Sequence, residues 1–267
     1  MPIKKTVLFI LLLTFIPSLF AHEFWLNPGK FIYKRTDKIN IRFLAGENFE
    51  GENWQGNNER IQSLKIYFGG VIDDLSPVVT DVAGDSIEYT MIDEGTNLVA
   101  FHSTNSFIEM EPEKFEAYLR EDGLTNALEY RNAHSENGCS GREFYQRCAK
   151  TLIQVGEIRD QTFKTTTFLP IDIIPLTNPY SAKDNELIRA KVFYKSTPLV
   201  NTLVKIWHRK NGKTEKKELT TDANGEIVFK VITRGKWMIS TVKMERVADN
   251  PVCDWQSYWG SLTWGYE

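Results

Sequence analysis

A histidine, His22, stands where the first residue of the mature chain is expected, directly after a segment with the features of an export signal. A chain that begins with His offers two nitrogens of one residue, the freed α-amine and the ring Nδ1, to a single metal ion. The two nitrogens close a six-membered chelate, and the amine has a low pKa of about 8 that lets it deprotonate readily. Imidazole and amine nitrogens favour Cu, Ni, Co and Zn over Mg or Ca. His22 is therefore the first candidate metal ligand.

The expected export signal covers residues 1–21. Lys4 and Lys5 form its positive start, an apolar run over residues 7–20 follows, and Ala21 precedes the cut. This pattern predicts a chain that is carried across the inner membrane and cut there, which leaves the histidine at or next to the new end.

Candidates for the remaining ligands are few. Glu23 could add a carboxylate oxygen, but neighbouring residues of a strand point to opposite faces, so it ranks low. His102 ends a predicted strand and shares its face with apolar residues. This position is equally typical of an ordinary half-buried histidine that binds no metal. His134 is expected in a polar loop and His208 at the end of a strand, both as surface residues. A copper and nickel chelate that needs His third in the chain is absent, because Phe24 stands there.

Two other functions compete with simple metal binding. A copper-dependent oxidative enzyme would hold its ion in a histidine brace, for which His22 needs a second ligand such as His102. Enzymatic activity has no further support, since the sequence lacks a Gly-rich phosphate loop, Gly-x-Ser-x-Gly, His-Glu-x-x-His and Cys-x-x-Cys.

The other alternative is a non-catalytic module that contacts a glycan or a protein through aromatic residues and strand edges. Immunoglobulin-like sandwiches commonly serve in this way, although fold alone does not settle function. Core packing explains most of the tryptophans that could stack on a sugar, which are Trp25, Trp54, Trp255, Trp259 and Trp264.

Size and charge bound the class of protein. Without residues 1–21 the chain of 267 would keep 246, enough for one large domain or two of ordinary size, and two are preferred. The signal holds two of the 32 basic residues and none of the 35 acidic ones, so the mature net charge would be 30 minus 35, or −5. Scattered charges with an acidic balance argue against nucleic acid as a partner. No later stretch is apolar for long enough to span a bilayer.

Three cysteines, Cys139, Cys148 and Cys253, would remain after export, and an oxidising compartment permits one disulfide among them. If a helix starts at Ser140, roughly 13 Å of helix rise separates the first two, beyond the ~7 Å limit for bridged Cα atoms. The pairing stays open.

Residues 22–165 are expected to form an N-terminal β domain. Apolar residues alternate with polar ones in several runs, with turns expected at Gly46, Gly69-Gly70 and Gly95, and this pattern favours an antiparallel sandwich. Residues 46–56 lack a clean period and are interpreted as a loop. The alternating apolar residues are Ile39, Ile41 and Phe43, then Leu64, Ile66 and Phe68, then Ile87, Tyr89 and Met91.

A helical insertion is predicted at about residues 112–156. Its first helix begins at Pro112 and ends near Gly123, and a second runs from Thr125 to about His134. A third helix is expected from Ser140, where Ser140 and Glu143 have the spacing of a capping box. Apolar residues at helical intervals then follow before a stop at Gly156, namely Tyr145, Ala149, Leu152 and Ile153.

Residues 166–267 predict a second domain, a small immunoglobulin-like β-sandwich. Prolines at 170, 175 and 179 mark the passage into it, and residues 221–225 form a turn. Residues 253–264 are expected to hold the last strand of the fold, with Tyr258, Gly260, Leu262 and Trp264 on one side. Earlier strands alternate at Ile188, Ala190, Val192 and Tyr194, at Val204 and Ile206, at Ile227 and Phe229, and at Trp237, Ile239 and Thr241.

Six separated motifs, in order, carry a family resemblance. They are Ala-His-Glu-Phe-Trp-Leu at 21–26, Phe-Glu-Ala-Tyr-Leu-Arg-Glu-Asp-Gly at 115–123, Arg-Glu-Phe-Tyr-Gln-Arg-Cys-Ala-Lys at 142–150, Ile-Asp-Ile-Ile-Pro-Leu-Thr-Asn-Pro at 171–179, Thr-Asp-Ala-Asn-Gly at 221–225 and Asp-Trp-Gln-Ser-Tyr-Trp-Gly-Ser-Leu-Thr at 254–263. Over nearly the whole mature chain this series resembles a bacterial family of largely uncharacterised periplasmic proteins, grouped with the periplasmic component of cobalt and nickel uptake systems.

The resemblance implies a periplasmic protein of two β-sandwich domains that binds a transition metal ion, nickel or cobalt, and assists its uptake. It implies a membrane metal transporter as a partner and His22 as the first ligand. One departure counts against simple transfer, because similar proteins often have His where this chain has Lys243. A protonated Lys is a poor ligand unless it is strongly desolvated.

Overall fold

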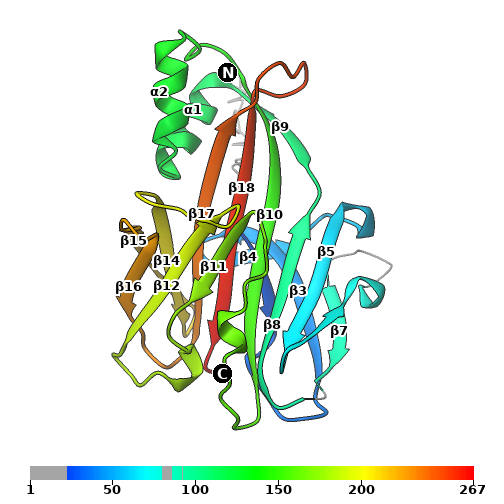
Figure 1. Cartoon of the computed structure of the whole chain (residues 1–267). Helices are drawn as coiled ribbons and strands as arrows, with labels where there is room; N and C mark the ends of the chain where they lie inside the picture. The colour runs from blue at the N-terminus through cyan, green and yellow to red at the C-terminus, as the bar shows by residue number, and fades with distance from the viewer. Residues whose placement is uncertain (1–22, 80–85, 92) are drawn as a thin grey trace, which may run out of the picture.

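The computed structural model describes residues 23–79, 86–91 and 93–267 of the chain. The expected export signal at residues 1–21 and the candidate ligand His22 lie outside the described residues. The described chain is mainly β, as predicted, and its strands build sheets that pack face to face (Figure 1).

Among the described residues, one sheet of ten strands runs through the molecule. Its strands are β2 (Ile32–Tyr33), β5 (Ile61–Phe68), β6 (Val71–Asp74), β8 (Gly95–Ser103), β9 (Ser106–Met110), β10 (Gly141–Val155), β14 (Leu203–Lys210), β15 (Lys213–Thr220), β17 (Lys236–Arg246) and β18 (Trp255–Gly265). They are arranged in the order β15-β14-β17-β18-β10-β8-β5-β6, and β2 and β9 pair with β10. The sheet therefore joins strands from both ends of the chain.

Two smaller sheets cover opposite faces of this long sheet. The first consists of β1 (Glu23–Pro28), β3 (Lys38–Glu47), β4 (Glu50–Asn53) and β7 (Ser86–Thr90). The second consists of β11 (Ile171–Pro175), β12 (Leu187–Tyr194), β13 (Thr197–Pro198) and β16 (Glu226–Lys230). We call the first sheet with β5, β8 and β10 the N-terminal sandwich, and the second with β14, β17 and β18 the C-terminal sandwich.

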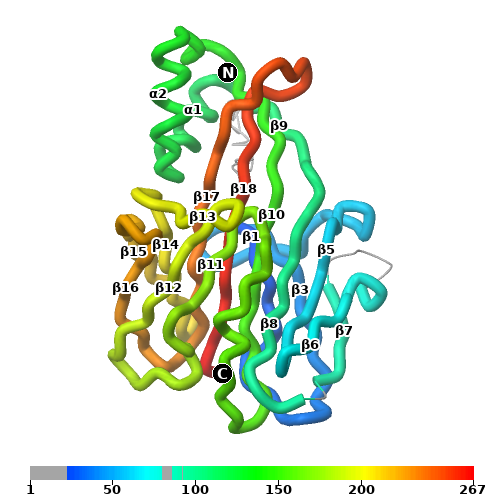
Figure 2. The backbone as a smooth tube through the Cα atoms, viewed as in Figure 1, coloured from blue at the N-terminus to red at the C-terminus, as the bar shows by residue number. Residues whose placement is uncertain are grey.

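The two sandwiches meet at β10 and β18, which lie side by side in parallel through the middle of the molecule (Figure 2). Alternate residues of β10 belong to different cores. Ala149 and Ile153 pack in the core of the N-terminal sandwich, whereas Cys148 and Leu152 pack in the core of the C-terminal one. Side chains of β10 are therefore buried on both faces from residue 148 to the end of the strand. The domain boundary predicted near residue 165 stays a prediction, and one sheet crosses it.

Two helices cover the far end of the long sheet, on the same face as the first small sheet. They are α1 (Pro112–Glu121) and α2 (Thr125–Ala133), as predicted. Phe115 and Leu119 of α1 pack against Trp255 and Met244, and Asn126 Nδ2 of α2 donates a hydrogen bond to the Met244 carbonyl at 3.0 Å. The helices thus act as a third covering layer.

The third predicted helix, from Ser140 to Gly156, is wrong, because these residues form β10. An apolar run buried on both faces contains helical intervals by chance, so the spacing of Tyr145, Ala149 and Leu152 was misleading. The helical insertion is shorter than predicted and ends at α2.

The predicted loop at residues 46–56 and the predicted turn at Gly46 also need correction. The loop region contains the hairpin of β3 and β4. Gly46 lies within β3 and pairs with Gly51 of β4. The two-residue turn of the hairpin, Asn48 and Phe49, takes positive φ values of 52° and 57°, the conformation that matches the twist of paired strands.

The cysteines stay unpaired. Cys139, Cys148 and Cys253 are all free thiols, with the first exposed and the other two buried. Since Cys148 lies on a strand, the helix-rise argument against pairing it with Cys139 no longer applies. Burial raises the pKa of the Cys148 thiol to about 12, so this thiol is unreactive near neutral pH.

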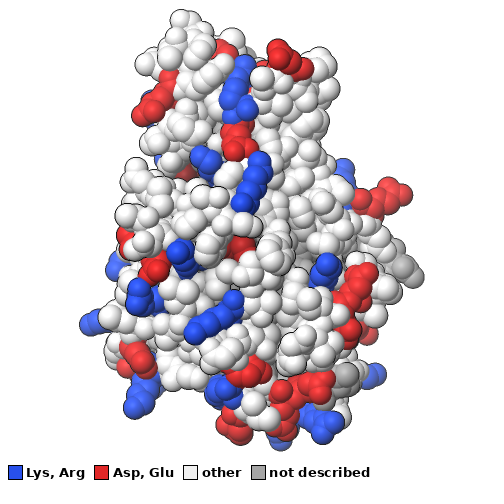
Figure 3. All heavy atoms as spheres, in the orientation of Figure 1, with Lys and Arg blue, Asp and Glu red and all other residues white. Residues whose placement is uncertain are grey.

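Charges of both signs are scattered over the surface. Figure 3 shows basic and acidic side chains interspersed over one face, without a broad patch of either sign. In the part of the chain that the structure describes, no helix has the length and apolar character needed to cross a bilayer.

The last strand, β18, lies where the sequence predicts it. Gly260 on this strand allows the second small sheet to approach the long sheet closely. A Cβ at Gly260 would lie 2.1 Å from Ile171 Cγ2 on β11, far inside van der Waals contact. We expect Gly260→Ala to lower the free energy of unfolding by about 1–3 kcal/mol in urea denaturation, because the two layers must separate. Gly138→Ala, where a Cβ meets open space, should change it by less than about 0.5 kcal/mol, and equal effects would contradict the packing.

Candidate functional site

Glu23 is the described residue next to the predicted metal ligand, and it begins β1. Its backbone is paired with Gly46 of β3, and its side chain is buried. The carboxylate does not face solvent but meets Lys205 of β14, with 3.4 Å between Lys205 Nζ and Glu23 Oε1. Glu23 is therefore held by both its backbone and its side chain.

Lys205 joins three distant parts of the chain. Its ammonium also donates to Asp122 Oδ1 at 2.7 Å, directly after α1, and all three side chains are nearly inaccessible. Local structure places Asp122 there, because α1 ends at this point and Gly123 turns the chain with a positive φ of 64°. The start of β1, the end of α1 and strand β14 of the long sheet are thus tied together by one ammonium.

A third buried carboxyl, Glu143 of β10, lies deeper under α1. Its Oε1 accepts hydrogen bonds from Tyr118 Oη, at 3.2 Å, and from Ser257 Oγ. Trp259 Nε1 donates to the same serine oxygen at 3.1 Å, and its ring stacks on Tyr118. Oε2 of Glu143 is buried and has no hydrogen-bond partner among the described residues. We call Glu23, Asp122, Glu143 and Lys205 the buried charge cluster.

Burial dominates the titration of this cluster. Desolvation raises the pKa of Glu23, although Lys205 opposes the shift. For the same reason the pKa of Asp122 rises to about 6 and that of Glu143 to about 7. Burial works to lower the pKa of Lys205, but the two neighbouring carboxylates outweigh it and the pKa is raised. The ammonium stays charged, and burial opposes the ionisation of all three carboxyls.

The cluster itself leaves no room for a ligand. The cavity between Glu23, Asp122 and Lys205 is about 10 Å³, roughly the space that one water molecule needs. The Glu23 carboxylate contacts Lys205, and the low rank of Glu23 as a metal ligand stays a prediction. Any ion bound near this cluster must lie outside it.

The structure does not bring His102 to the start of β1. Its side chain points to the face of the long sheet that carries Leu98 and Ala100, as predicted, whereas Phe24 packs on Phe101 at the opposite face. Its ring Nε2 lies 3.0 Å from Gln146 Oε1, and burial lowers the pKa of the imidazole. His22 lies outside the described residues, so a histidine brace with His102 stays a prediction.

The other two predicted histidines are held by local contacts. His134 is exposed, as predicted, and stacks on Tyr130 with 3.9 Å between ring centroids. His208 is buried rather than on the surface, because its ring stacks on Trp237 at 4.2 Å and its Nε2 donates to the Arg234 carbonyl. Each lies at a separate place in the fold.

Lys243 lies on β17. Val242 and Met244 face α1, and the Lys243 side chain points to the opposite face of the sheet. It pairs across the sheet with Tyr258. Because Val242 lines the cavity of the buried charge cluster and strand neighbours alternate, Lys243 points away from the cluster. A ligand on this face of β17 would therefore be separated by the long sheet from a ligand at the start of β1.

The tryptophans proposed as a sugar platform belong to the core. None of the five is more than 8% exposed: Trp25, Trp54, Trp255, Trp259 and Trp264. Within residues 23–79, 86–91 and 93–267, no group of three or more His, Cys, Asp or Glu side chains is arranged to hold a metal ion.

Sequence reasoning missed the buried charge cluster. Glu143 was interpreted as part of a helix cap, which hid its burial on a strand. Lys205 gave a usable signal, because it interrupts the apolar run Val204 to Ile206 and buried lysines need acidic partners. Asp122 gave none, since it resembles an ordinary residue at a helix end.

The raised pKa of Glu143 makes stability depend on pH. A carboxyl whose folded pKa is about 7, against an ordinary 4.5, favours folding at low pH and loses that contribution as pH rises through 7. The loss amounts to as much as about 3 kcal/mol. We expect Glu143→Gln to flatten the decline in the free energy of unfolding between pH 5 and 8 and to be the more stable protein at pH 8. Glu129→Gln, at an exposed residue, should keep the original decline.

Removal of the shared ammonium has a larger effect. Lys205→Met leaves Glu23 and Asp122 buried without a counter-charge, which should cost about 3–5 kcal/mol at pH 8. The loss should shrink toward pH 5, because burial raises the pKa of both carboxyls and a lower pH favours their neutral forms. Lys195→Met, which removes an exposed pair with Glu245, should cost less than about 1 kcal/mol. Equal losses in the two variants, measured by urea denaturation, would refute the role given to Lys205.

Comparison with known proteins gives a family and little more. No curated protein matches the chain. Dimeric latent PorU from Porphyromonas gingivalis is similar over 88% of this chain and 20% of the PorU chain, at 11% identity with a TM-score of 0.19. The chain thus spans about a fifth of that protein, and a likeness this weak carries no argument. Residues 19–245 match the family model described as a domain of unknown function, DUF4198. Since the match covers most of its length, the chain belongs to this family.

Proposed function

We propose that the protein is exported to the periplasm, binds a transition metal ion, nickel or cobalt, through His22 at its mature N-terminus, and assists uptake of that ion. The observation that carries the proposal is the fixed position of Glu23, the residue that follows this histidine, beside an excess of buried acid. His22 itself lies outside the described residues.

Charge favours a cation next to the cluster. The buried charge cluster holds three carboxyls and one ammonium. Arg147 is a further basic residue near Glu23, and its guanidinium stacks on Phe24 at 5.1 Å and on Tyr145 at 5.3 Å. Three acids against two bases leave a surplus of negative charge when all are ionised. A divalent ion close to the start of β1 would offset that surplus across a poorly hydrated interior.

Rigidity favours a chelate at this point of the chain. Glu23 cannot shift without loss of its pairing to Gly46 and its contact with Lys205. A ligand attached directly to such a residue loses less conformational entropy on binding than one on a free tail. The α-amine and Nδ1 of one histidine would supply two ligands from a single anchored position.

The remaining steps of the proposal come from the family resemblance. Uptake of the ion, its identity as nickel or cobalt, and transfer to a membrane transporter component rest on the six motifs. Lys243 and His102 are not included in the site, because their side chains lie on the opposite face of the long sheet from β1.

A titration of the exported protein tests this proposal. Isothermal calorimetry with Ni²⁺, Co²⁺, Cu²⁺ and Zn²⁺ should show one site in the chain that begins at His22. One extra residue before His22 removes the free amine from the chelate and should weaken binding by more than ~10-fold, while urea denaturation of the metal-free protein stays unchanged. Binding should also weaken below about pH 6.5, because imidazole and amine must lose their protons.

His134→Ala is the matched control, since it removes an exposed histidine that contacts Tyr130 alone among the described rings. It should leave the affinity unchanged. Equal binding by the extended and the native chain would eliminate the N-terminal site, and a loss confined to His102→Gln would favour a copper brace instead.

A further inference from the structure

A groove opens along the side of the C-terminal sandwich, away from the buried charge cluster. It lies between β15 and β16, the edge strands of the long sheet and the second small sheet, and no described strand closes the gap between them. The groove has a volume of about 520 Å³, within the range of small-molecule sites. A second hollow of about 340 Å³ shares His208, Glu215 and Ile232 with it, so the depression continues along β15.

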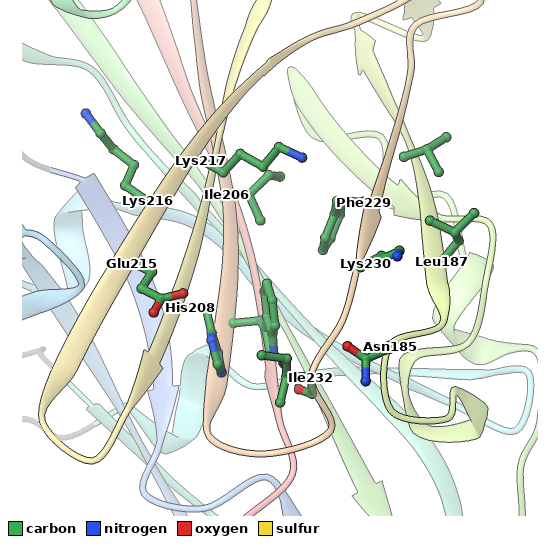
Figure 4. Close-up of a pocket in the computed structure, with 12 residues that line it drawn as sticks. Asn185, Leu187, Ile206, His208, Glu215, Lys216, Lys217, Phe229, Lys230 and Ile232 are labelled. Carbon is green, nitrogen blue, oxygen red and sulfur yellow. Dashed lines mark hydrogen bonds between the residues drawn. The ribbon is translucent and has the colours of Figure 1, made fainter.

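The floor of the groove is apolar, and its two aromatic side chains are no more than 5% exposed. Ile206 and Phe229 (Figure 4) form it together with Trp237. Both faces of the Trp237 indole are already covered, by His208 at 4.2 Å and by Trp264 at 6.1 Å between ring centroids. A sugar that needs to stack on an aromatic ring therefore finds no platform here, whereas an aliphatic chain finds edges and methyl groups.

The outer wall of the groove exposes aliphatic side chains. Leu187 is 53% exposed and Val228 45% exposed on neighbouring strands of the small sheet, and Ile232 lies half-buried beside them. These three side chains form an apolar strip that water covers in the free protein, and Ile206 lies buried below it. Contiguous apolar surface of this kind is typical of a binding site.

Two lysines stand over this apolar strip without acidic partners. Lys217 extends from β15 toward β16, and Lys230 lies beside Phe229 on the other wall (Figure 4). Neither ammonium has an ion-pair partner among the described residues, and Glu215 is the one acidic residue in the lining. The mouth of the groove therefore carries a positive charge above an aliphatic interior.

Protection of an exposed strand edge would explain lysines on β15, but it does not explain Lys217. Lys216 has the protective position, since it points away from the groove, pairs with Glu218 and lies 5.6 Å from the Trp207 ring. Lys217 lies on the other face of the strand together with Leu219, which packs on the core of the C-terminal sandwich. Its ammonium thus overhangs the groove.

We propose that this groove binds a single-chain aliphatic acid, with the carboxylate between Lys217 and Lys230 and the chain along Ile206, Ile232 and Val228. A cationic amphiphile would be repelled by the same lysines. A neutral amphiphile would leave the two lysines without a partner, so its complex would lack a charge-assisted hydrogen bond. The proposal is independent of His22 and of any metal.

Calorimetry with three ligands of equal chain length tests the charge preference. The full mature chain is titrated with dodecanoate, dodecanol and dodecyltrimethylammonium, each below the concentration at which it forms micelles, in the presence of a chelator. We expect one dodecanoate per chain, bound at least ~10-fold more tightly than dodecanol, as one charge-assisted hydrogen bond would supply. The trimethylammonium compound should bind more weakly than both.

Variants locate the site. Lys217→Gln with Lys230→Gln should weaken dodecanoate binding by ~10-fold or more and leave dodecanol unchanged, while Lys216→Gln should leave both unchanged. Val228→Asp, at an exposed residue that should not disturb folding, should weaken both ligands. The proposal is overturned if dodecanoate does not bind, if it binds no better than dodecanol, or if the double variant binds it as tightly as the native chain does.

Discussion

The pairing of β10 with β18 is the constraint on which the rest of the molecule depends. These two strands come from distant parts of the chain, lie parallel over residues 143–151 and 255–263, and are covered on both faces. A strand with two apolar faces must separate two cores, so the sandwiches form on opposite sides of one sheet rather than as beads on a linker. Within the C-terminal sandwich, the close approach of β11 to β18 needs a residue without a side chain at Gly260.

The same constraint produces the buried charge cluster. Where the first small sheet stops, α1 and α2 take over the covering of the long sheet, and the seam between these layers receives the start of β1 and the end of α1. Lys205 bridges the seam through Glu23 and Asp122, and Glu143 fills it below Tyr118. Carboxyls in such a seam are poorly hydrated and resist ionisation, so protons or cations at this place change stability and not only charge.

Sequence patterns predict the strands of one-sided burial well and fail where burial is two-sided. Period two located β3, β5, β12 and β16, and helix signals located both helices. β10 was mistaken for a helix, because its apolar residues follow no single period once both faces are covered. For the candidate site, sequence singled out His22 and ranked Glu23 low, but it could not reveal that Asp122 and Lys205 meet there, since contacts between residues more than 80 apart depend on the folded layers. The groove between β15 and β16 was also hidden, because it arises from where two sheets end.

The central claim is that an anchored terminal histidine, rather than any cluster inside the fold, binds the metal ion. Top-down fragmentation of the exported, nickel-loaded protein in a native mass spectrometer tests it most directly. The account predicts that the chain begins at His22 and that the ion stays with the shortest N-terminal fragments. An ion that stays instead with fragments from the rest of the chain, or a chain whose first residue lies elsewhere, would contradict it.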